Sequence, residues 1–203
     1  MSDDPMRRLQ RVYAAIGEAI DTDAFEFRPV TRRDGDQYAT SVRFDEASEE
    51  EMQNTIYSAV HNVANLRDHL KKWARQHGKD SGVIDKAVDA SPELKMVVDL
   101  SNRDKHGGPP RDGGLSGLSP NLVRFRRGMT SVQPGQTVTT FTIFFGEAPN
   151  VAFGEGAAVM TSADVVDLSG NVVGDAIALL NVAVGQWEQV LRECGLAPEE
   201  QPG

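Results

Sequence analysis

Hydrophobic residues recur at alternating steps of four and three over residues 48–76, the most regular pattern in the chain. This period keeps them on one side of an α-helix and predicts a long helix that faces the core. Ser48, followed by three glutamates, predicts the N-terminal cap, and Gly78 predicts the stop. The stripe consists of Met52, Ile56, Ala59, Val63, Leu66, Leu70 and Trp73.

Helical periodicity predicts further helices on both sides of this segment. Ser91, Pro92 and Glu93 form a cap, a first-turn proline and an acid, which start a helix that ends near Lys105. Val173 is expected on the buried side of the last helix. The predicted ranges are residues 7–20, a short region after residue 80, residues 92–105 and residues 171–194.

Alternating apolar and polar residues predict antiparallel strands in the C-terminal half, at residues 122–129, 137–145 and 157–168. An earlier hairpin is predicted from strands at residues 25–28 and 38–44 around a loop at 32–36.

Glycine and proline are concentrated at residues 107–120, which lack apolar periodicity. This composition predicts a flexible loop whose glycines provide slack. Neither side of the loop has enough apolar elements for a core of its own, so residues 1–203 are expected to form a single α+β domain. Residues 1–110 supply a helix, a hairpin and a helical pair, and residues 121–195 supply strands and the last helix. The fold class is a helical bundle-like core with a small antiparallel β-sheet, followed by a mobile tail at 196–203.

Composition narrows the class of protein. With 39% hydrophobic and 25% charged residues, the chain fits neither a membrane protein nor a disordered one. A net charge of −9 indicates that any nucleic-acid contact is local. Cys194 is the only cysteine, no signal peptide is apparent, and no Cys/His cluster has zinc-ligand spacing. We therefore expect a cytoplasmic protein with no cofactor, no metal and no membrane association.

The most informative run is Asp-Leu-Ser-Asn-Arg-Asp-Lys-His-Gly-Gly at residues 99–108, at the end of a predicted helix. Tyr57, His61 and the triplet Leu66-Arg67-Asp68 lie on the long helix before it. Together these residues resemble a group of small bacterial proteins that is HEPN-like, and the resemblance covers mainly residues 48–106. It implies a helical bundle and, for many members, RNase activity within toxin or phage-defence systems.

The resemblance also implies a catalytic motif of an arginine, a polar residue that is often asparagine, and a histidine. Asn102 and His106 match the polar residue and the histidine, but Ser101 stands where the arginine is expected. A histidine can move the proton of a 2′-hydroxyl while a cation stabilises the charge that builds on the phosphorane. Arg103 or Arg67 is the candidate for that missing cation.

Other basic residues are candidates for contact with RNA. Lys105 lies inside the motif, and Arg124 and Arg126 flank Phe125 on a predicted strand, so the arginines could follow phosphates while Phe125 stacks. In the alternative interpretation, Val123 and Phe125 form a core face and the two arginines form a solvated face.

Structural alternatives exist for the motif as well. Asn102, Lys105 and His106 are typical of a helix C-terminus, where cations favour the negative end of the dipole. For Arg67 and Asp68 the alternative is a pair of exposed or interhelical ions that fix packing, which is commoner than catalysis. A further polar face, His61, Asn65 and Asp68, is either solvated or lines an interface or site.

Two functions follow. The first is a HEPN-like RNase, or an RNase-derived component of a bacterial stress or phage-defence system, with RNA, an antitoxin-like protein or its own copies as partners. The alternative is a non-catalytic, self-associating interaction module, which the missing arginine and the acidic balance support. A small-ligand sensor has no positive motif, and the signatures Gly-x-Ser-x-Gly, Gly-x-x-x-x-Gly-Lys-Ser/Thr and His-Glu-x-x-His are absent from the sequence.

Overall fold

The computed structural model describes the backbone of residues 4–21, 30–34, 37–41, 47–109, 111–131 and 157–196, and the side chains within 4–19, 47–109, 111–128 and 160–196. The fold class is α+β, as predicted. The helices are α1 (Pro5–Glu18), α2 (Glu49–Gln76), α3 (Gly82–Ala90), α4 (Pro92–His106) and α5 (Ala176–Glu193), with a short 3-10 turn η1 (Arg111–Gly113). The strands are β1 (Ile20–Asp21), β2 (Val30–Asp34), β3 (Gln37–Ser41), β4 (Asn121–Ser131), β5 (Ala157–Val166) and β6 (Val172–Asp175).

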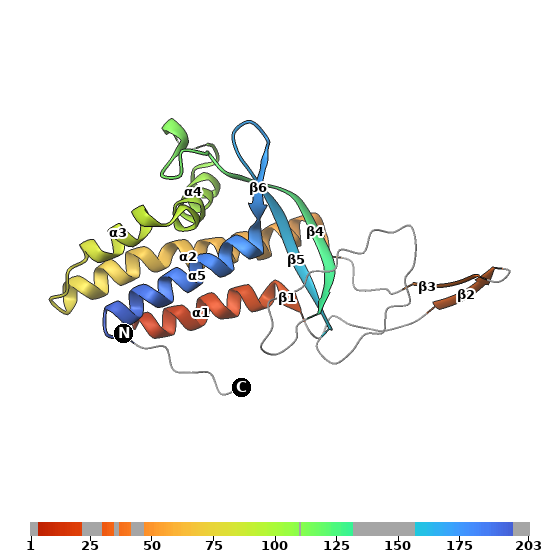
Figure 1. Cartoon of the computed structure of the whole chain (residues 1–203), viewed down its shortest axis with the longest axis horizontal. Helices are drawn as coiled ribbons and strands as arrows, with labels where there is room; N and C mark the ends of the chain where they lie inside the picture. The colour runs from red at the N-terminus through yellow and green to blue at the C-terminus, as the bar shows by residue number, and fades with distance from the viewer. Residues whose placement is uncertain are drawn as a thin grey trace.

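Helix α2 runs through the middle of the molecule, with α1 and α5 beside it and α3 and α4 at its other side (Figure 1). Its predicted stripe is confirmed, because Ile56, Val63, Leu66 and Leu70 are at most 1% exposed. Trp187 of α5 is fully buried against it, and its indole N–H donates to the Val63 carbonyl at 3.0 Å. Buried residues from before and after the 107–120 segment belong to one hydrophobic core.

The predicted ends of α2 and α4 are also confirmed. The Ser48 hydroxyl accepts from the N–H of Glu51, whose carboxylate accepts from the N–H of Ser48, and together they form a capping box. Ser91 caps α4 before Pro92, and Gly107 ends that helix with a left-handed φ of 66°. These local signals fix where α4 stops, and so they fix the position of the candidate motif.

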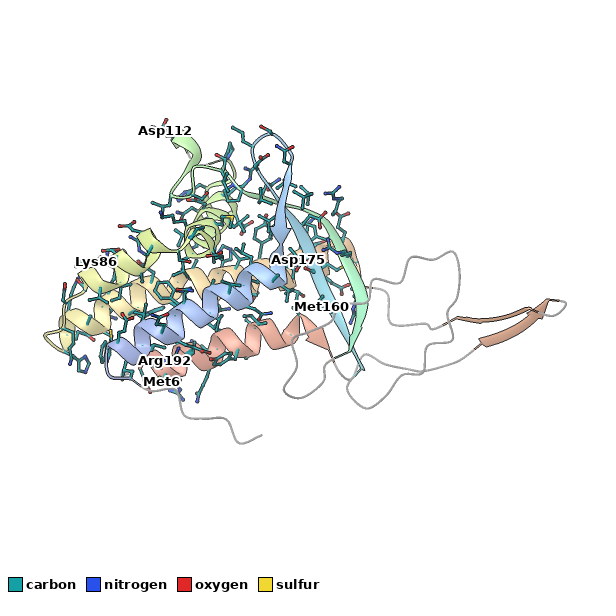
Figure 2. All side chains as sticks on the ribbon, in the orientation of Figure 1. Met6, Lys86, Asp112, Met160, Asp175 and Arg192 are labelled. Atoms are coloured by element: carbon teal, nitrogen blue, oxygen red, sulfur yellow. The ribbon has the colours of Figure 1, made fainter. Side chains whose placement is uncertain are left out.

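The main sheet is antiparallel and lies across one end of the helices (Figure 1). Strand β5 is central, with β4 along one edge and β1 and β6 on the other. Strands β2 and β3 form a separate hairpin. The side chains drawn in Figure 2 fill the space between this sheet and the helices.

Several predicted boundaries were wrong. Residues 172–175 form β6 rather than the start of the last helix, and Val173 is 39% exposed. The reason is local, because Asp175 is the N-cap of α5 and its carboxylate binds the first free N–H groups. The first helix ends at Glu18, so Ile20 lies in β1, and β2 occupies most of the predicted hairpin loop. The strands predicted at 25–28 and 137–145 and most of the predicted tail lie outside the described residues.

Polar contacts anchor the loop after α4, although its sequence has no apolar period. Asp99 is 1% exposed and accepts the N–H groups of Leu115 at 2.9 Å and Ser116 at 2.7 Å. Gly114 has φ of 72°, and a Cβ there would lie 2.5 Å from the Asp99 carboxylate. The expectation that these glycines provide only slack therefore needs correction, because Gly114 is required for this close approach.

Candidate functional site

The candidate motif on α4 packs against the polar face of α2. The His61 ring lies between two side chains of α4, with Nδ1 at 2.8 Å from the Ser101 hydroxyl and Nε2 at 2.8 Å from the Asp104 carboxylate. One turn along, the Lys105 ammonium donates to the Asn65 side-chain oxygen at 2.9 Å. We call these five residues, together with Tyr57, the α2–α4 cluster.

The carboxylate determines the direction of these hydrogen bonds. An ionised Asp104 can only accept, so Nε2 of His61 carries the hydrogen that points to it. In the neutral ring, Nδ1 then accepts from the Ser101 hydroxyl. Both nitrogens of the imidazole are therefore used within the protein.

Tyr57 lies beside this ring and closes the cluster toward the sheet. Its ring centroid is 6.3 Å from that of His61 and 6.4 Å from that of Phe125 on β4. Burial, followed by the nearby charge of Asp104, raises the pKa of the Tyr57 hydroxyl, and Arg103 acts in the opposite direction. The tyrosine therefore stays neutral and packs as an aromatic residue.

The serine, histidine and aspartate contact one another in the order found in a hydrolytic triad. The serine, however, is less accessible than catalysis needs. Ser101 is 1% exposed and faces α2 from the middle of a helical turn. A nucleophile must reach the substrate, and this hydroxyl is covered by His61 itself. The arrangement acts as a clip between two helices, with its histidine side chain 25% exposed and its aspartate 43% exposed.

Asn102 and His106 lie away from this clip. Both are exposed and stand one turn apart near the C-terminal end of α4. Among the described residues, neither side chain has a hydrogen-bond or ion-pair partner. The structure thus places the two motif residues side by side on a free surface, without a cation joined to them.

Each candidate cation has another partner. The Arg67 guanidinium donates to the Asp85 carboxylate of α3 from Nη2 at 2.7 Å and from Nε at 3.3 Å. Lys71 reaches the other oxygen of Asp85 at 2.6 Å. The hydrogen bonds from Lys71 and Arg67 lower the pKa of the Asp85 carboxyl, so it remains charged and holds both cations. Arg103 donates to the backbone carbonyl of Ser119 at 3.4 Å.

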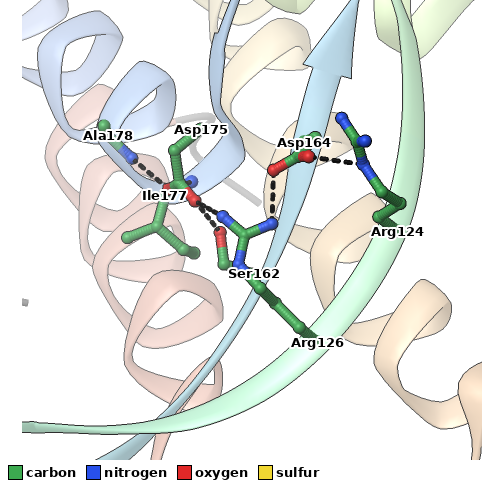
Figure 3. A network of polar contacts seen from close by, with 7 residues as sticks. All are labelled: Arg124, Arg126, Ser162, Asp164, Asp175, Ile177 and Ala178. Atoms are coloured by element: carbon green, nitrogen blue, oxygen red, sulfur yellow. Dashed lines mark hydrogen bonds and ion pairs between the residues drawn. The ribbon is translucent and has the colours of Figure 1, made fainter. Parts of the chain in front are cut away.

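The arginines of β4 are held by carboxylates as well (Figure 3). Arg126 binds Asp164 of β5 and Asp175, and the Arg124 Nε lies 2.7 Å from Asp164. Burial alone would raise the pKa of Asp164, but the hydrogen bond and charge of Arg126 and the charge of Arg124 lower it. Asp175 also accepts from the Ser162 hydroxyl while it caps α5, so the network ties the sheet to the helix.

A β-bulge changes the predicted alternation of β4. The register with β5 shifts between Val123 and Arg126, and Arg124 has a φ of 51°. Because of the extra residue, both Leu122 and Phe125 pack toward the core although they are three positions apart. Phe125 is therefore a core-facing residue as the alternative interpretation predicted, but its partner on that face is Leu122 rather than Val123.

No family model, curated protein or solved structure matches this chain. Within the described ranges, no group of three or more His, Cys, Asp or Glu side chains is arranged to hold a metal ion. The helices in the same ranges include none that is long and apolar enough to cross a membrane. The function must therefore be inferred from the contacts described above.

The sequence did not predict the pairing of His61 with Ser101 and Asp104. Its only signal was the shared spacing, with His61 and Asn65 four apart on one helix and Ser101 and Lys105 four apart on the other. Such spacing shows that each pair shares a face, but not that the two faces meet.

Proposed function

We propose that this chain is an RNase-derived, non-catalytic interaction component of a bacterial stress or phage-defence system that acts in the cytoplasm. The observation that carries the proposal is the engagement of every candidate cation by another group of the same chain. The biological setting comes from the HEPN-like resemblance of residues 48–106.

The first supporting argument concerns the missing charge. Cleavage through a phosphorane needs a cation aimed at the phosphate, and Ser101 provides none. Arg67 would have to leave a carboxylate that it binds through two nitrogens, and Arg103 would have to leave the Ser119 carbonyl. Asn102 and His106 by themselves supply hydrogen bonding and proton transfer without that stabilisation.

The second argument concerns the binding of RNA. Phosphate contacts dominate affinity for nucleic acids and require cations that are free to replace counterions. Arg124 and Arg126 are paired with the carboxylates of Asp164 and Asp175, whereas Lys105 donates to the uncharged Asn65 side chain and keeps its positive charge. In a chain of net charge −9, this arrangement favours a protein partner over a polyanion.

An active RNase is the second candidate, favoured by the exposed positions of Asn102 and His106 one turn apart. In that case His106 would act as the acid or base, and Arg67 or Arg103 would move toward the substrate. The two candidates differ in one directly measurable property, the cleavage of RNA by the purified chain.

The test incubates the full chain with end-labelled mixed-sequence RNA, with and without a chelator of divalent metals. We expect no cleavage above that of a mock purification from cells lacking the gene. The matched variants are H106A and H77A, because His77 is likewise an exposed histidine at the C-terminal end of a helix. Cleavage that H77A keeps and H106A loses, with unchanged melting temperatures, would overturn the non-catalytic proposal.

A further inference from the structure

Exposed apolar side chains gather where the loop after α4 meets the turn between β5 and β6. The backbone N–H of Leu168 donates to the carbonyl of Leu118 at 3.0 Å, which joins the two segments. Both project from the upper side of the molecule in Figure 1, and Figure 2 labels Asp112 at the outer end of the loop. Of the six large hydrophobic side chains exposed within the described residues, five lie here: Leu115, Leu118, Leu168, Val172 and Val173. We call these five residues the apolar tip.

The backbone explains why these side chains face outward. The register between β5 and β6 shifts at Val173, because Val172 pairs with Val166 and Gly174 pairs with Val165. A regular strand would turn one of two neighbouring valines inward, but with the extra residue both are exposed, at 54% and 39%.

The loop half of the apolar tip is held in a defined conformation. Asp99 binds the N–H groups of Leu115 and Ser116, and the N–H of Ser119 donates to the Gly113 carbonyl at 2.9 Å. An apolar surface on such an anchored loop loses little conformational freedom when a partner covers it. This distinguishes the apolar tip from scattered exposed hydrophobic residues, which are normal on any protein surface.

Charge identifies the partner. Residues 113–123 and 168–174, which carry the five side chains of the apolar tip, contain no charged residue, although a quarter of the chain is charged. Asp112 and Asp167 directly precede these two segments and border the apolar tip. Two copies of a chain with net charge −9 repel each other over most of their surfaces. They can meet without opposing like charges where both are uncharged, whereas a basic partner would be drawn to the acidic surface instead.

We propose that the apolar tip is the surface through which two copies of this chain associate. In a two-fold arrangement each copy presents the same five side chains, so an uncharged apolar surface is automatically complementary to itself. Leu168, 73% exposed, is the most prominent side chain and the expected central anchor of the contact. This inference rests on the proposed function in that it specifies the partner of the interaction component.

The test measures the molar mass of the full chain in solution over a range of concentrations, by light scattering after size exclusion and by sedimentation equilibrium. We expect the wild-type chain to have the mass of two copies. In L168E, association would bury the new carboxylate in the contact between the two copies. The dissociation constant should therefore rise by about thirtyfold or more, the usual effect of losing a central anchor. This variant should have the mass of one copy.

Val182 provides the matched control. Among the described residues it is the one exposed large hydrophobic residue outside the apolar tip, 46% exposed on α5, so V182E adds the same charge away from the apolar tip. V182E should remain dimeric, and V172K should dissociate like L168E. Melting temperatures close to the wild-type value establish that the variants fold, as expected for exposed positions.

Two outcomes would overturn the inference. One is a wild-type chain that is a monomer at all concentrations. This result overturns the inference even if the apolar tip binds a different protein. The other is a dimer that persists in both L168E and V172K. RNA cleavage by the chain would refute the proposed function without changing these masses, so the two failures can be told apart.

Discussion

The contact between His61 and Ser101 makes a measurable prediction about what joins α2 to α4. We consider the substitutions H61A and S101A, alone and together. The buried Ser101 hydroxyl, 2.8 Å from the imidazole, loses this partner in H61A. The imidazole is only partly buried, so in S101A it keeps Asp104 and can bind water with its other nitrogen.

The expected magnitudes follow from this difference in burial. Leaving a buried donor unsatisfied costs about 1–3 kcal/mol, and we expect the lower half of this range because a helical serine can turn to the carbonyl four residues before it. S101A should cost about 0.5–1.5 kcal/mol, the net value of one hydrogen bond. The double variant should be less destabilised than the sum of both by about 1 kcal/mol, since neither group is then left unpaired.

The assay is urea unfolding of all four proteins at neutral pH, with the slope of the transition unchanged between them. The control is the cycle N65A and K105A, which removes a hydrogen bond of similar length, 2.9 Å, between the same two helices at an exposed position. That cycle should show a coupling energy of about 0–0.5 kcal/mol. If the effects of H61A and S101A add to within about 0.3 kcal/mol, the clip contributes no coupling and the interpretation of the cluster is refuted.

Three other substitutions test the rest of the fold. Leu66 is 1% exposed, so L66A should lower the free energy of unfolding by about 2–5 kcal/mol; an unchanged melting temperature would show that its stripe does not form the core. Asp99 holds two backbone N–H groups of the loop, so D99A should speed tryptic cleavage after Arg111 by at least about tenfold, as measured by mass spectrometry. Equal cleavage rates would contradict the conclusion that Asp99 anchors the loop. The lowered pKa of Asp85 means that its charge stabilises the fold fully above the ordinary carboxyl pKa, and that this contribution is lost as the pH falls through the lowered value. D85N should therefore lower the melting temperature near neutral pH and approach the wild type in acid, whereas D89N, at an exposed position in the last turn of the same helix, should not lower it at any pH.

The sequence predicted the elements whose signals are local. The capping box at Ser48, the proline at the start of α4 and the glycine at its end each act within a few residues, so the bounds of α2 and α4 agree with the structure to within a residue or two. The four-three stripe predicted the buried face of α2 for the same reason, although Met52 and Trp73 at its two ends are only half-buried.

The sequence could not predict features that depend on which surfaces meet. The bulges in β4 and β6 reverse the direction of side chains, and they arise from pairing with β5 rather than from local composition. Asp99 was predicted only as part of a motif, whereas its function in the structure is to hold a loop more than a dozen residues away. For the same reason the sequence could indicate that Arg67 is an ion that fixes helix packing, but it could not identify Asp85 as the partner.

Position 101 connects the two kinds of information. The resemblance expects an arginine there, but in this fold the position is buried and faces His61, so the space between α2 and α4 suits a small hydroxyl side chain. A guanidinium at this site would be desolvated beneath the imidazole, with Asp104 already occupied by Nε2 of that ring. Ser101 is therefore not simply an arginine that is missing from an otherwise intact site. In this chain the residue that stands where the resemblance expects a cation makes the contact with His61 that joins the two helices, and an arginine placed there would have to displace His61.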